Sequence, residues 1–274
     1  GATAVGIDFS FKGKNTRLTG FPEADESINL IDTSEEPKRV TNVDYYSMYG
    51  HVPLVYGHSA TQMLSFFWIN PTDTFLKIHT DEANDRRNIR VLSEGGFLDI
   101  VVFTGKMNTL IESYTDLTGK PDIPPMFTLG YHQSKWGYKN QSMVENVIDQ
   151  LDANDFPIDV MWLDVDHLYG HGPFRFNRTA FPHPDALFKK LADKNRYLVR
   201  LNDPHIPTDE TFPIYVEAKD KNYFVRNPDG ETQFKGHCWP GQSSWPDFLN
   251  PTVRDWWATL YQFEANETAP NVYF

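Results

Sequence analysis

The chain has 274 residues, of which 40% are hydrophobic and 15% aromatic, so it can bury a sizeable core in one large domain or in two of ordinary size. Its formal net charge of −12 offers no basic surface for phosphates, and no apolar run approaches the roughly 20 residues that span a bilayer, so we expect neither a nucleic-acid partner nor a membrane span. The single cysteine, Cys238, excludes an internal disulfide framework and a cysteine-based zinc site.

The first hundred residues predict antiparallel β-structure, because apolar runs with strand-like alternation are separated by turn residues. The expected strands include residues 7–11, 64–69, 74–79 and 97–104, with a turn at 70–73. Apolar residues then recur at helical spacing from Met107 to Leu117, and Gly119 ends that helix. We therefore expect residues 1–119 to form part of a β-sandwich domain with a connecting helix.

Beyond Lys120 the predicted strands and helices alternate, which is typical of βαβ units and a parallel sheet. The expected strands are residues 126–134, 159–164, 197–203 and 271–274. The expected helices begin at Ser142, in a capping box with Glu145, and at Pro184, Ile214 and Pro251. Four such units are half of a (β/α)₈ TIM barrel, so residues 120–274 predict an α/β half barrel with two unpaired edges.

Polar residues close three of these predicted strands, at the end of the barrel where active sites lie. Side chains alternate along a strand, so we expect Asp164 and Asp166 to share a face with Trp162, and Asp203 to point toward the same rim. Carboxylates accept hydroxyl hydrogen bonds, and indole faces cover the C–H side of a sugar ring. The pattern therefore favours binding of a neutral polyol.

Two other interpretations of these residues stay open. Short polar side chains at strand ends often cap the loop that follows. A divalent metal site is the second interpretation, since oxygen and imidazole ligands are available, although the histidines lack the i, i+4 pairing of a helical zinc site. The candidate ligands are Asp164, Asp166, His167, Asp203 and His205.

Several motifs of the barrel part carry a resemblance to a known family. They are Leu129-Gly-Tyr-His-Gln-Ser-Lys-Trp136, Trp162-Leu-Asp-Val-Asp-His167, Asp203-Pro-His-Ile206, Trp239-Pro-Gly241 and Pro246-Asp-Phe-Leu-Asn-Pro251. The N-terminal part adds Gly6-Ile-Asp-Phe-Ser10, Asn42-Val-Asp44 and Met48-Tyr-Gly50. In order and spacing these motifs resemble glycoside hydrolase family 31, and within it the enzymes that trim glucose from N-glycans.

The resemblance implies roles for individual residues. A sandwich loop of the family offers an aspartate to the substrate, and Asp44 matches it, whereas Asp164 matches the residue that binds hydroxyls of the released sugar. Trp136 and Trp239 match the walls of the sugar pocket. Three further positions match the pocket floor, namely Val165, Leu201 and Asp203.

The resemblance also implies that the catalytic carboxylates lie beyond Phe274. The family's nucleophile belongs to a Trp-x-Asp-Met-Asn-Glu motif on the fourth strand, and the acid/base aspartate follows it. A retaining glycosidase needs two carboxyl groups roughly 5 Å apart, so no catalytic residue is assigned within this chain. Neither an organic cofactor nor a metal is required by this chemistry.

The resemblance implies a retaining α-glucosidase that removes terminal glucose from N-glycans in the endoplasmic reticulum lumen. Its expected partners are the carbohydrate substrate, the remainder of the catalytic chain and a non-catalytic β subunit. Sequons at Asn140, Asn177 and Asn266 agree with the secretory pathway, although about two are expected by chance. The alternatives are a family member acting on α-xyloside or α-glucan, and a non-catalytic sugar-binding or structural module.

Overall fold

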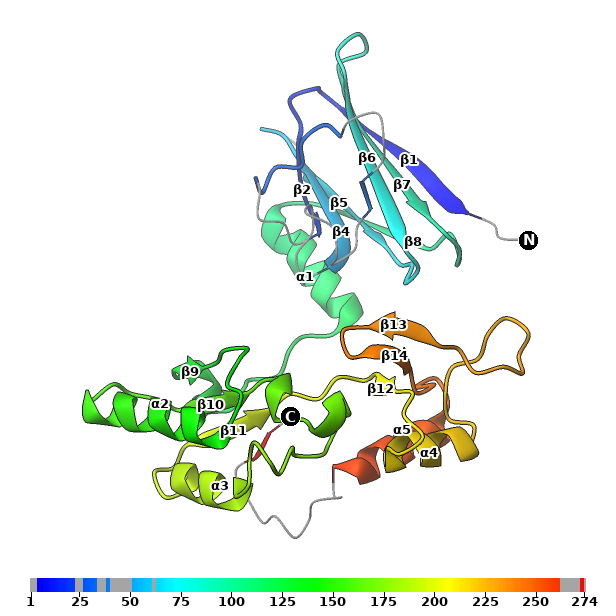
Figure 1. Cartoon of the computed structure of the whole chain (residues 1–274). Helices are drawn as coiled ribbons and strands as arrows, with labels where there is room; N and C mark the ends of the chain where they lie inside the picture. Colours follow the sequence, from blue (N-terminus) through cyan, green and yellow to red (C-terminus); the bar gives the residue numbers. More distant parts are fainter. Residues whose placement is uncertain are drawn as a thin grey trace. The chain divides into compact units, whose positions relative to one another are not determined.

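The computed structural model describes residues 4–22, 27–33, 38–39, 51–60, 63–261 and 272–273. The chain divides into two compact units, Gly1–Asp122 and Ile123–Phe274 (Figure 1). Among these residues, the first unit contains antiparallel sheets and a helix, and the second contains a parallel sheet with helices and a small antiparallel sheet.

The first unit is a sandwich of two antiparallel sheets (Figure 1). One sheet has the order β1 (Val5–Lys12), β7 (Arg86–Ser93), β6 (Thr74–Asp81) and β3 (Lys38–Arg39). The other has the order β2 (Arg17–Pro22), β4 (His51–His58), β5 (Met63–Trp68) and β8 (Ile100–Thr104). Apolar side chains of both sheets meet in one core, where Phe66 and Trp68 of β5 join Leu76 of β6 and Ile89 of β7, all fully buried.

The turn at residues 70–73 connects the two sheets, since β5 and β6 flank it and lie in different sheets. Its Asn70 side chain donates to the carbonyls of Gly95 (2.8 Å) and Phe97 (3.3 Å), so it also holds the 94–98 loop. The prediction of a strand from residue 97 is therefore wrong at its start. Phe97 is 87% exposed, and the strand begins at Ile100.

The predicted helix after the sandwich is confirmed as α1 (Met107–Thr118). Leu110 is fully buried, and the Tyr114 ring meets Phe67 edge-on at 5.2 Å between centroids. Gly119 ends the helix with a φ of 96°, a left-handed value that favours glycine.

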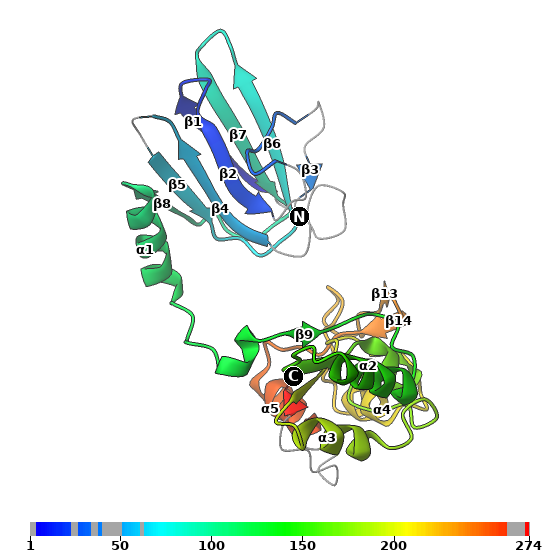
Figure 2. The same ribbon diagram turned by 90° about the vertical axis from the view of Figure 1, so that its left-hand side faces the viewer.

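The second unit is built on four parallel strands that follow one another in chain order, as in the first half of a (β/α)₈ barrel. They are β9 (His132–Gln133), β10 (Val160–Leu163), β11 (Tyr197–Arg200) and β15 (Val272–Tyr273). Helices α2 (Gln141–Ala153) and α3 (Pro184–Ala192) lie together against the sheet (Figure 1, Figure 2). Their Val144, Ile148 and Leu187 pack on Met161 and Leu163 of β10.

The second unit contains another hydrophobic core, formed mainly by the long segment between β11 and β15. Helices α4 (Pro213–Asp220) and α5 (Pro251–Leu260) bury Tyr215, Val253 and Trp256 in it. The same segment forms an antiparallel sheet of β12 (Ile206–Pro207), β14 (Gly241–Ser244) and β13 (Gly236–Cys238). This small sheet carries the residues that lead into Trp239.

The structure corrects the prediction of a strand over residues 126–134. Met126–Leu129 is a 3₁₀ turn, in which the backbone N–H of Thr128 donates to the carbonyl of Pro125 at 3.0 Å and the Thr128 hydroxyl donates to the same carbonyl at 2.7 Å, and β9 is confined to His132–Gln133. At Gly130 a Cβ would lie 2.1 Å from the carboxylate of Asp159, the residue before β10, so a side chain there would collide with that carboxylate.

The predicted capping box at Ser142 is also wrong. Asn140 is the N-cap, and its side-chain oxygen accepts from the backbone of Met143 at 2.9 Å and from the Ser142 hydroxyl at 2.8 Å. Ser142 thus supports the cap, and the helix begins one residue earlier, at Gln141.

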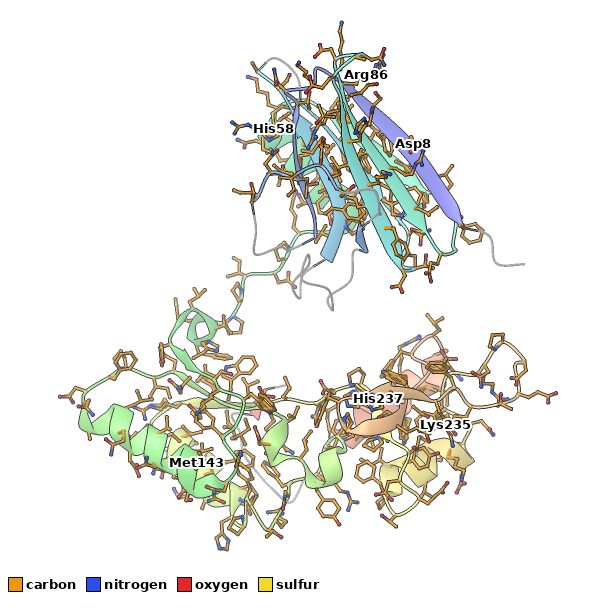
Figure 3. All side chains as sticks on the ribbon, turned by 45° about the horizontal axis from the view of Figure 1, so that its top comes forward. Asp8, His58, Arg86, Met143, Lys235 and His237 are labelled. Carbon is orange, nitrogen blue, oxygen red and sulfur yellow. The ribbon has the colours of Figure 1, made fainter. Side chains whose placement is uncertain are left out.

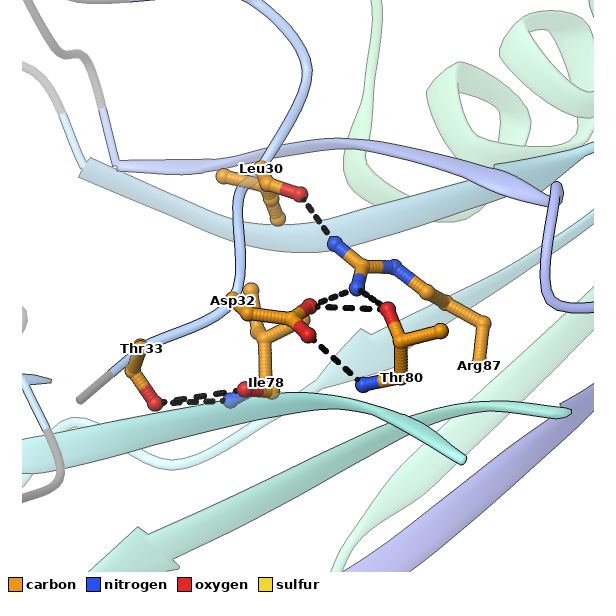
Figure 4. Close-up of polar contacts among 6 residues, drawn as sticks. All are labelled: Leu30, Asp32, Thr33, Ile78, Thr80 and Arg87. Atoms are coloured by element: carbon orange, nitrogen blue, oxygen red, sulfur yellow. Dashed lines mark hydrogen bonds and ion pairs between the residues drawn. The ribbon is translucent and has the colours of Figure 1, made fainter. Parts of the chain in front are cut away.

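A buried arginine fastens the 27–33 segment to the sandwich (Figure 4). Arg87 of β7 donates to the carbonyl of Leu30 at 2.7 Å and contacts the Thr80 hydroxyl and the Asp32 carboxylate. Asp32 in turn accepts from the backbone of Thr80 at 2.9 Å. Because the Arg87 side chain is only 8% exposed, burial lowers the pKa of Arg87, and these acceptors compensate the buried charge.

We predict that Arg87→Met lowers the free energy of unfolding of the sandwich by about 2 kcal/mol, because it leaves the buried carbonyl of Leu30 without its charged donor and Asp32 without its cation. The matched control is Arg86→Met, at the neighbouring position, whose side chain is exposed at the end of β7 (Figure 3). We expect the control to change stability by less than about 0.5 kcal/mol. Chemical denaturation followed by circular dichroism measures both, and equal losses would contradict the account.

Candidate functional site

The candidate site is built from the loops that follow β9, β10 and β11. The backbone of Leu201 donates to the carbonyl of Leu163 at 3.0 Å, so the loops that follow β10 and β11 begin side by side at the same edge of the sheet. The predicted strands through Asp164 and Asp203 are too long, since β10 ends at Leu163 and β11 at Arg200. The alternation expected for Asp164 and Asp166 therefore does not apply, because a 3₁₀ turn, Val165–His167, follows the strand.

Asp164 begins this turn and is its N-cap. One carboxylate oxygen accepts from the backbone of Val165 at 2.7 Å, and the Asp164 carbonyl accepts from the Nδ1 of His167 at 2.6 Å. His167 is fully buried, and this burial, with the charge of Arg200 as the smaller cause, lowers its pKa to about 3. A neutral imidazole therefore supports the Asp164 turn at every physiological pH.

Asp166 connects the β10 loop to the β9 loop. Its carboxylate accepts from the backbone of Gly137 at 2.7 Å, directly after Trp136. Gly137 has a φ of 104°, which favours glycine, and the Trp136 side chain is 73% exposed. Asp166 thus holds the backbone from which Trp136 projects, and one of its oxygens is already occupied.

Asp203 and Trp239 are brought together directly, although 36 positions separate them in the chain. The indole N–H of Trp239 donates to the Asp203 carboxylate at 2.7 Å, and the indole remains 47% exposed. The buried His205 meets the Trp239 ring edge-on at 5.6 Å, and the sulfur of Cys238 lies 3.5 Å from its Nδ1. Burial lowers the pKa of His205, which the nearby Asp203 carboxylate partly offsets.

The other predicted positions fall into two groups. Val165 and Leu201 are half-buried residues at the ends of β10 and β11. Asp44 lies outside the described residues. Asp164, Asp166 and Asp203, the three carboxylates predicted to converge, each accept one N–H, from Val165, Gly137 and Trp239 respectively.

A further connection between strand ends was not anticipated from the sequence. The indole N–H of Trp162 donates to Nδ1 of His132 at 3.0 Å, which leaves the hydrogen of that imidazole on Nε2. Nε2 lies 3.2 Å from the carbonyl of Thr128 and can donate to it. Only the aromatic character of Trp162 hinted at this contact, because its acceptor is 30 positions away.

Two of the three sequon asparagines are described. Asn140 caps α2, and the Asn177 side chain accepts from the backbone of Thr179 at 3.1 Å and of Ala180 at 3.2 Å. Both side chains are half-buried, and Asn266 lies outside the described residues. Both described asparagines therefore have local structural roles that do not depend on glycosylation.

Neither a metal cluster nor a membrane-spanning helix is found in the described part of the chain. No three His, Cys, Asp or Glu side chains there are grouped to hold a metal ion, so the metal interpretation gains no support. No helix among these residues is long and apolar enough to cross a bilayer.

Residues 121–270 match the glycosyl hydrolases family 31 TIM-barrel domain, and residues 1–76 match the family 31 N-terminal galactose mutarotase-like domain. The chain belongs to glycoside hydrolase family 31. The family resemblance and the half-barrel fold with a preceding sandwich are thereby confirmed.

Similar family 31 proteins extend well beyond this segment. The chain is 36% identical over its whole length to Neutral alpha-glucosidase AB of Dictyostelium discoideum, covering 30% of that protein, and 35% identical to human Neutral alpha-glucosidase C, covering 33% of it. A solved endoplasmic-reticulum glucosidase II heterodimer matches 99% of the chain, with a TM-score of 0.89 and 30% identity, over 32% of its own chain. The chain thus spans about a third of the length of these relatives.

We predict a pH-dependent contribution of His167 to stability. Its folded pKa of about 3 lies below the ordinary 6.5, so the unfolded chain takes up a proton that the folded chain refuses. The stabilisation is complete above pH 6.5 and is lost by about 1.4 kcal/mol per unit as the pH falls from there toward 3. Relative to His167→Asn, the wild type should lose about 2 kcal/mol between pH 7 and pH 5 in denaturant unfolding. A constant difference would contradict the buried, neutral imidazole.

Proposed function

We propose that the polypeptide carrying these residues is a retaining α-glucosidase that hydrolyses terminal α-linked glucose. Membership of family 31 supports the reaction class. The single observation that carries the sugar-binding role is the Trp239–Asp203 hydrogen bond, which fixes a half-exposed indole face beside the ends of parallel strands. An exposed, immobilised ring of this kind suits the apolar face of a sugar.

Within this proposal the residues have distinct tasks. Asp164 binds hydroxyls of the released glucose through the carboxylate oxygen that the backbone of Val165 leaves free. Trp136 and Trp239 form the walls of the pocket, while Val165, Leu201 and Asp203 form its floor. Residues 1–119 are assigned to the sandwich domain and residues 120–274 to the barrel half. Nucleophile and acid/base are assigned to later residues of the polypeptide, so this chain contributes binding rather than bond cleavage.

We further propose that the natural substrate is the glucosylated N-glycan of nascent glycoproteins, in the endoplasmic reticulum lumen, with a β subunit as partner. Support comes from the similarity to a glucosidase II catalytic subunit that was solved with the binding domain of its regulatory subunit. The relative named Glucosidase 2 subunit alpha from Schizosaccharomyces pombe, 33% identical across the whole chain, agrees with this assignment.

Two alternative functions are compatible with the proposed pocket walls, Trp136 and Trp239, because an indole face can pack on many sugars. One is a family 31 enzyme acting on α-xyloside or α-glucan, and the other is a sugar-binding or structural module without hydrolytic activity. Turnover of 4-nitrophenyl α-glucoside and α-xyloside by the polypeptide from its source separates the three. We expect the glucoside to be hydrolysed at least about tenfold faster than the xyloside. A site that hydrogen-bonds a substrate hydroxyl strongly disfavours a substrate that lacks this hydroxyl. Faster xyloside turnover, or binding without turnover, would favour the corresponding alternative.

We predict that Trp239→Ala lowers kcat/KM on 4-nitrophenyl α-glucoside by about tenfold, because an aromatic contact is worth about 0.5–1.5 kcal/mol. The matched pair Asp203→Asn and Asp203→Leu tests the support of that ring. Asparagine keeps an oxygen that accepts from the indole, so its loss should be smaller than that of leucine, which has no acceptor. Equal losses in the pair would show that Asp203 does not act through Trp239.

A further inference from the structure

His167 is a fully buried ionisable residue to which the proposed sugar chemistry gives no task. It is the last residue of the Val165–His167 turn, and its Nδ1 lies 2.6 Å from the carbonyl of Asp164. A carbonyl can only accept, so Nδ1 carries the hydrogen and Nε2 is left with a lone pair. The backbone N–H of His167 donates to the same carbonyl at 3.3 Å, so one oxygen is held twice from one residue.

The other ring nitrogen of His167 lies in a largely apolar environment. Nε2 is buried and has no hydrogen-bond partner within the described residues. The ring lies edge-on to Phe176 at 5.2 Å and to Phe181 at 6.5 Å. Arg200, whose guanidinium lies 3.9 Å from the centre of the Phe176 ring, adds a positive charge nearby. The apolar packing and the nearby cation both keep the imidazole neutral. Its polar contact with Asp164 is made through Nδ1–H.

The polar contacts of Asp164 explain what that group could control. Its carboxylate is held by the backbone of Val165 at 2.7 Å, and its carbonyl is held by His167. The backbone carbonyl and one carboxylate oxygen of Asp164 are thus both held. The other carboxylate oxygen has no hydrogen bond to any described residue, and Asp164 is only partly buried, so this oxygen can accept from a ligand. Fixing an acceptor before a ligand arrives avoids the cost of ordering it during binding.

We propose that His167 is a positioning residue that orients Asp164 for hydroxyl binding through the Nδ1–H hydrogen bond to the Asp164 carbonyl. The inference rests on the proposed function, since it takes Asp164 as the hydroxyl-binding residue. His167 touches neither the substrate nor the reacting atoms. Its effect on turnover passes entirely through Asp164, and its imidazole does not titrate during the reaction.

The test compares three variants of the full polypeptide. His167→Asn places an amide N–H close to the position of Nδ1 and keeps the donor, whereas His167→Gln extends it toward the position of Nε2. His167→Phe fills the site without a donor. We expect kcat/KM on 4-nitrophenyl α-glucoside to fall by about 10- to 100-fold in the phenylalanine and glutamine variants, as for a displaced binding group. The asparagine variant should stay within about threefold of wild type.

A double-mutant cycle separates positioning from general structural support. In an Asp164→Ala background, the change from His167 to Phe should cost less than about twofold, because the group that His167 orients is gone. A loss equal to that in the wild-type background, or equal losses for the asparagine and phenylalanine variants, would overturn the proposal.

Hydrogen exchange gives a readout that does not depend on activity. In the peptide spanning residues 162–168, the phenylalanine variant should exchange at least about fivefold faster than wild type, and the asparagine variant should match wild type, as expected when one local hydrogen bond is lost. Unchanged exchange in the phenylalanine variant would refute the proposal even if the polypeptide hydrolyses no glucoside. An inactive wild type with the expected exchange pattern would instead refute the proposed function and leave the role of His167 in holding the turn.

Discussion

The parallel ladder between β10 and β11 aligns Leu163 with Arg200, and the loops that follow must therefore leave the sheet at the same edge. Strands of four residues leave little ladder to hold those loops. Carboxylates at the strand ends hold the loops instead. Asp164, Asp166 and Asp203 each accept a hydrogen bond from an N–H of a loop backbone or of an indole. The carboxylates that we propose as ligands of sugar hydroxyls are thus also the groups that hold the loops in place.

This double use explains how Trp239, which we propose as a wall of the sugar pocket, can be half-exposed and still held in one orientation. A tryptophan on a long insertion would lose its bound orientation to side-chain and loop entropy unless another contact held it. Trp239 is held by Asp203 through its indole N–H, and Trp136 is held indirectly, through the backbone of Gly137 on Asp166. His167 and His205 are both buried, and burial lowers the pKa of each; the pKa of His167 falls to about 3, so its imidazole stays neutral at physiological pH.

The sequence predicted the order of elements well because hydrophobic periodicity decides helix and strand type, as for α1 and for the parallel strands that became β10 and β11. It failed where a short polar side chain competes with regular structure. Asp164 binds the next backbone N–H and ends the strand, so the expected alternation toward Asp166 does not occur. The Trp239–Asp203 contact depends on how the intervening insertion folds, which no local pattern encodes. The family motifs identified these two residues, but they did not indicate that the residues bind each other.

The central claim is that this chain supplies the sugar-binding wall of an α-glucosidase that retains anomeric configuration. The most direct measurement is the proton NMR spectrum of the glucose released in the first minutes of hydrolysis of 4-nitrophenyl α-glucoside by the full polypeptide. The account predicts that the α-anomer appears first and the β-anomer follows by mutarotation, because a glycosyl-enzyme intermediate gives two inversions. Initial release of the β-anomer, or no release of glucose, would contradict it.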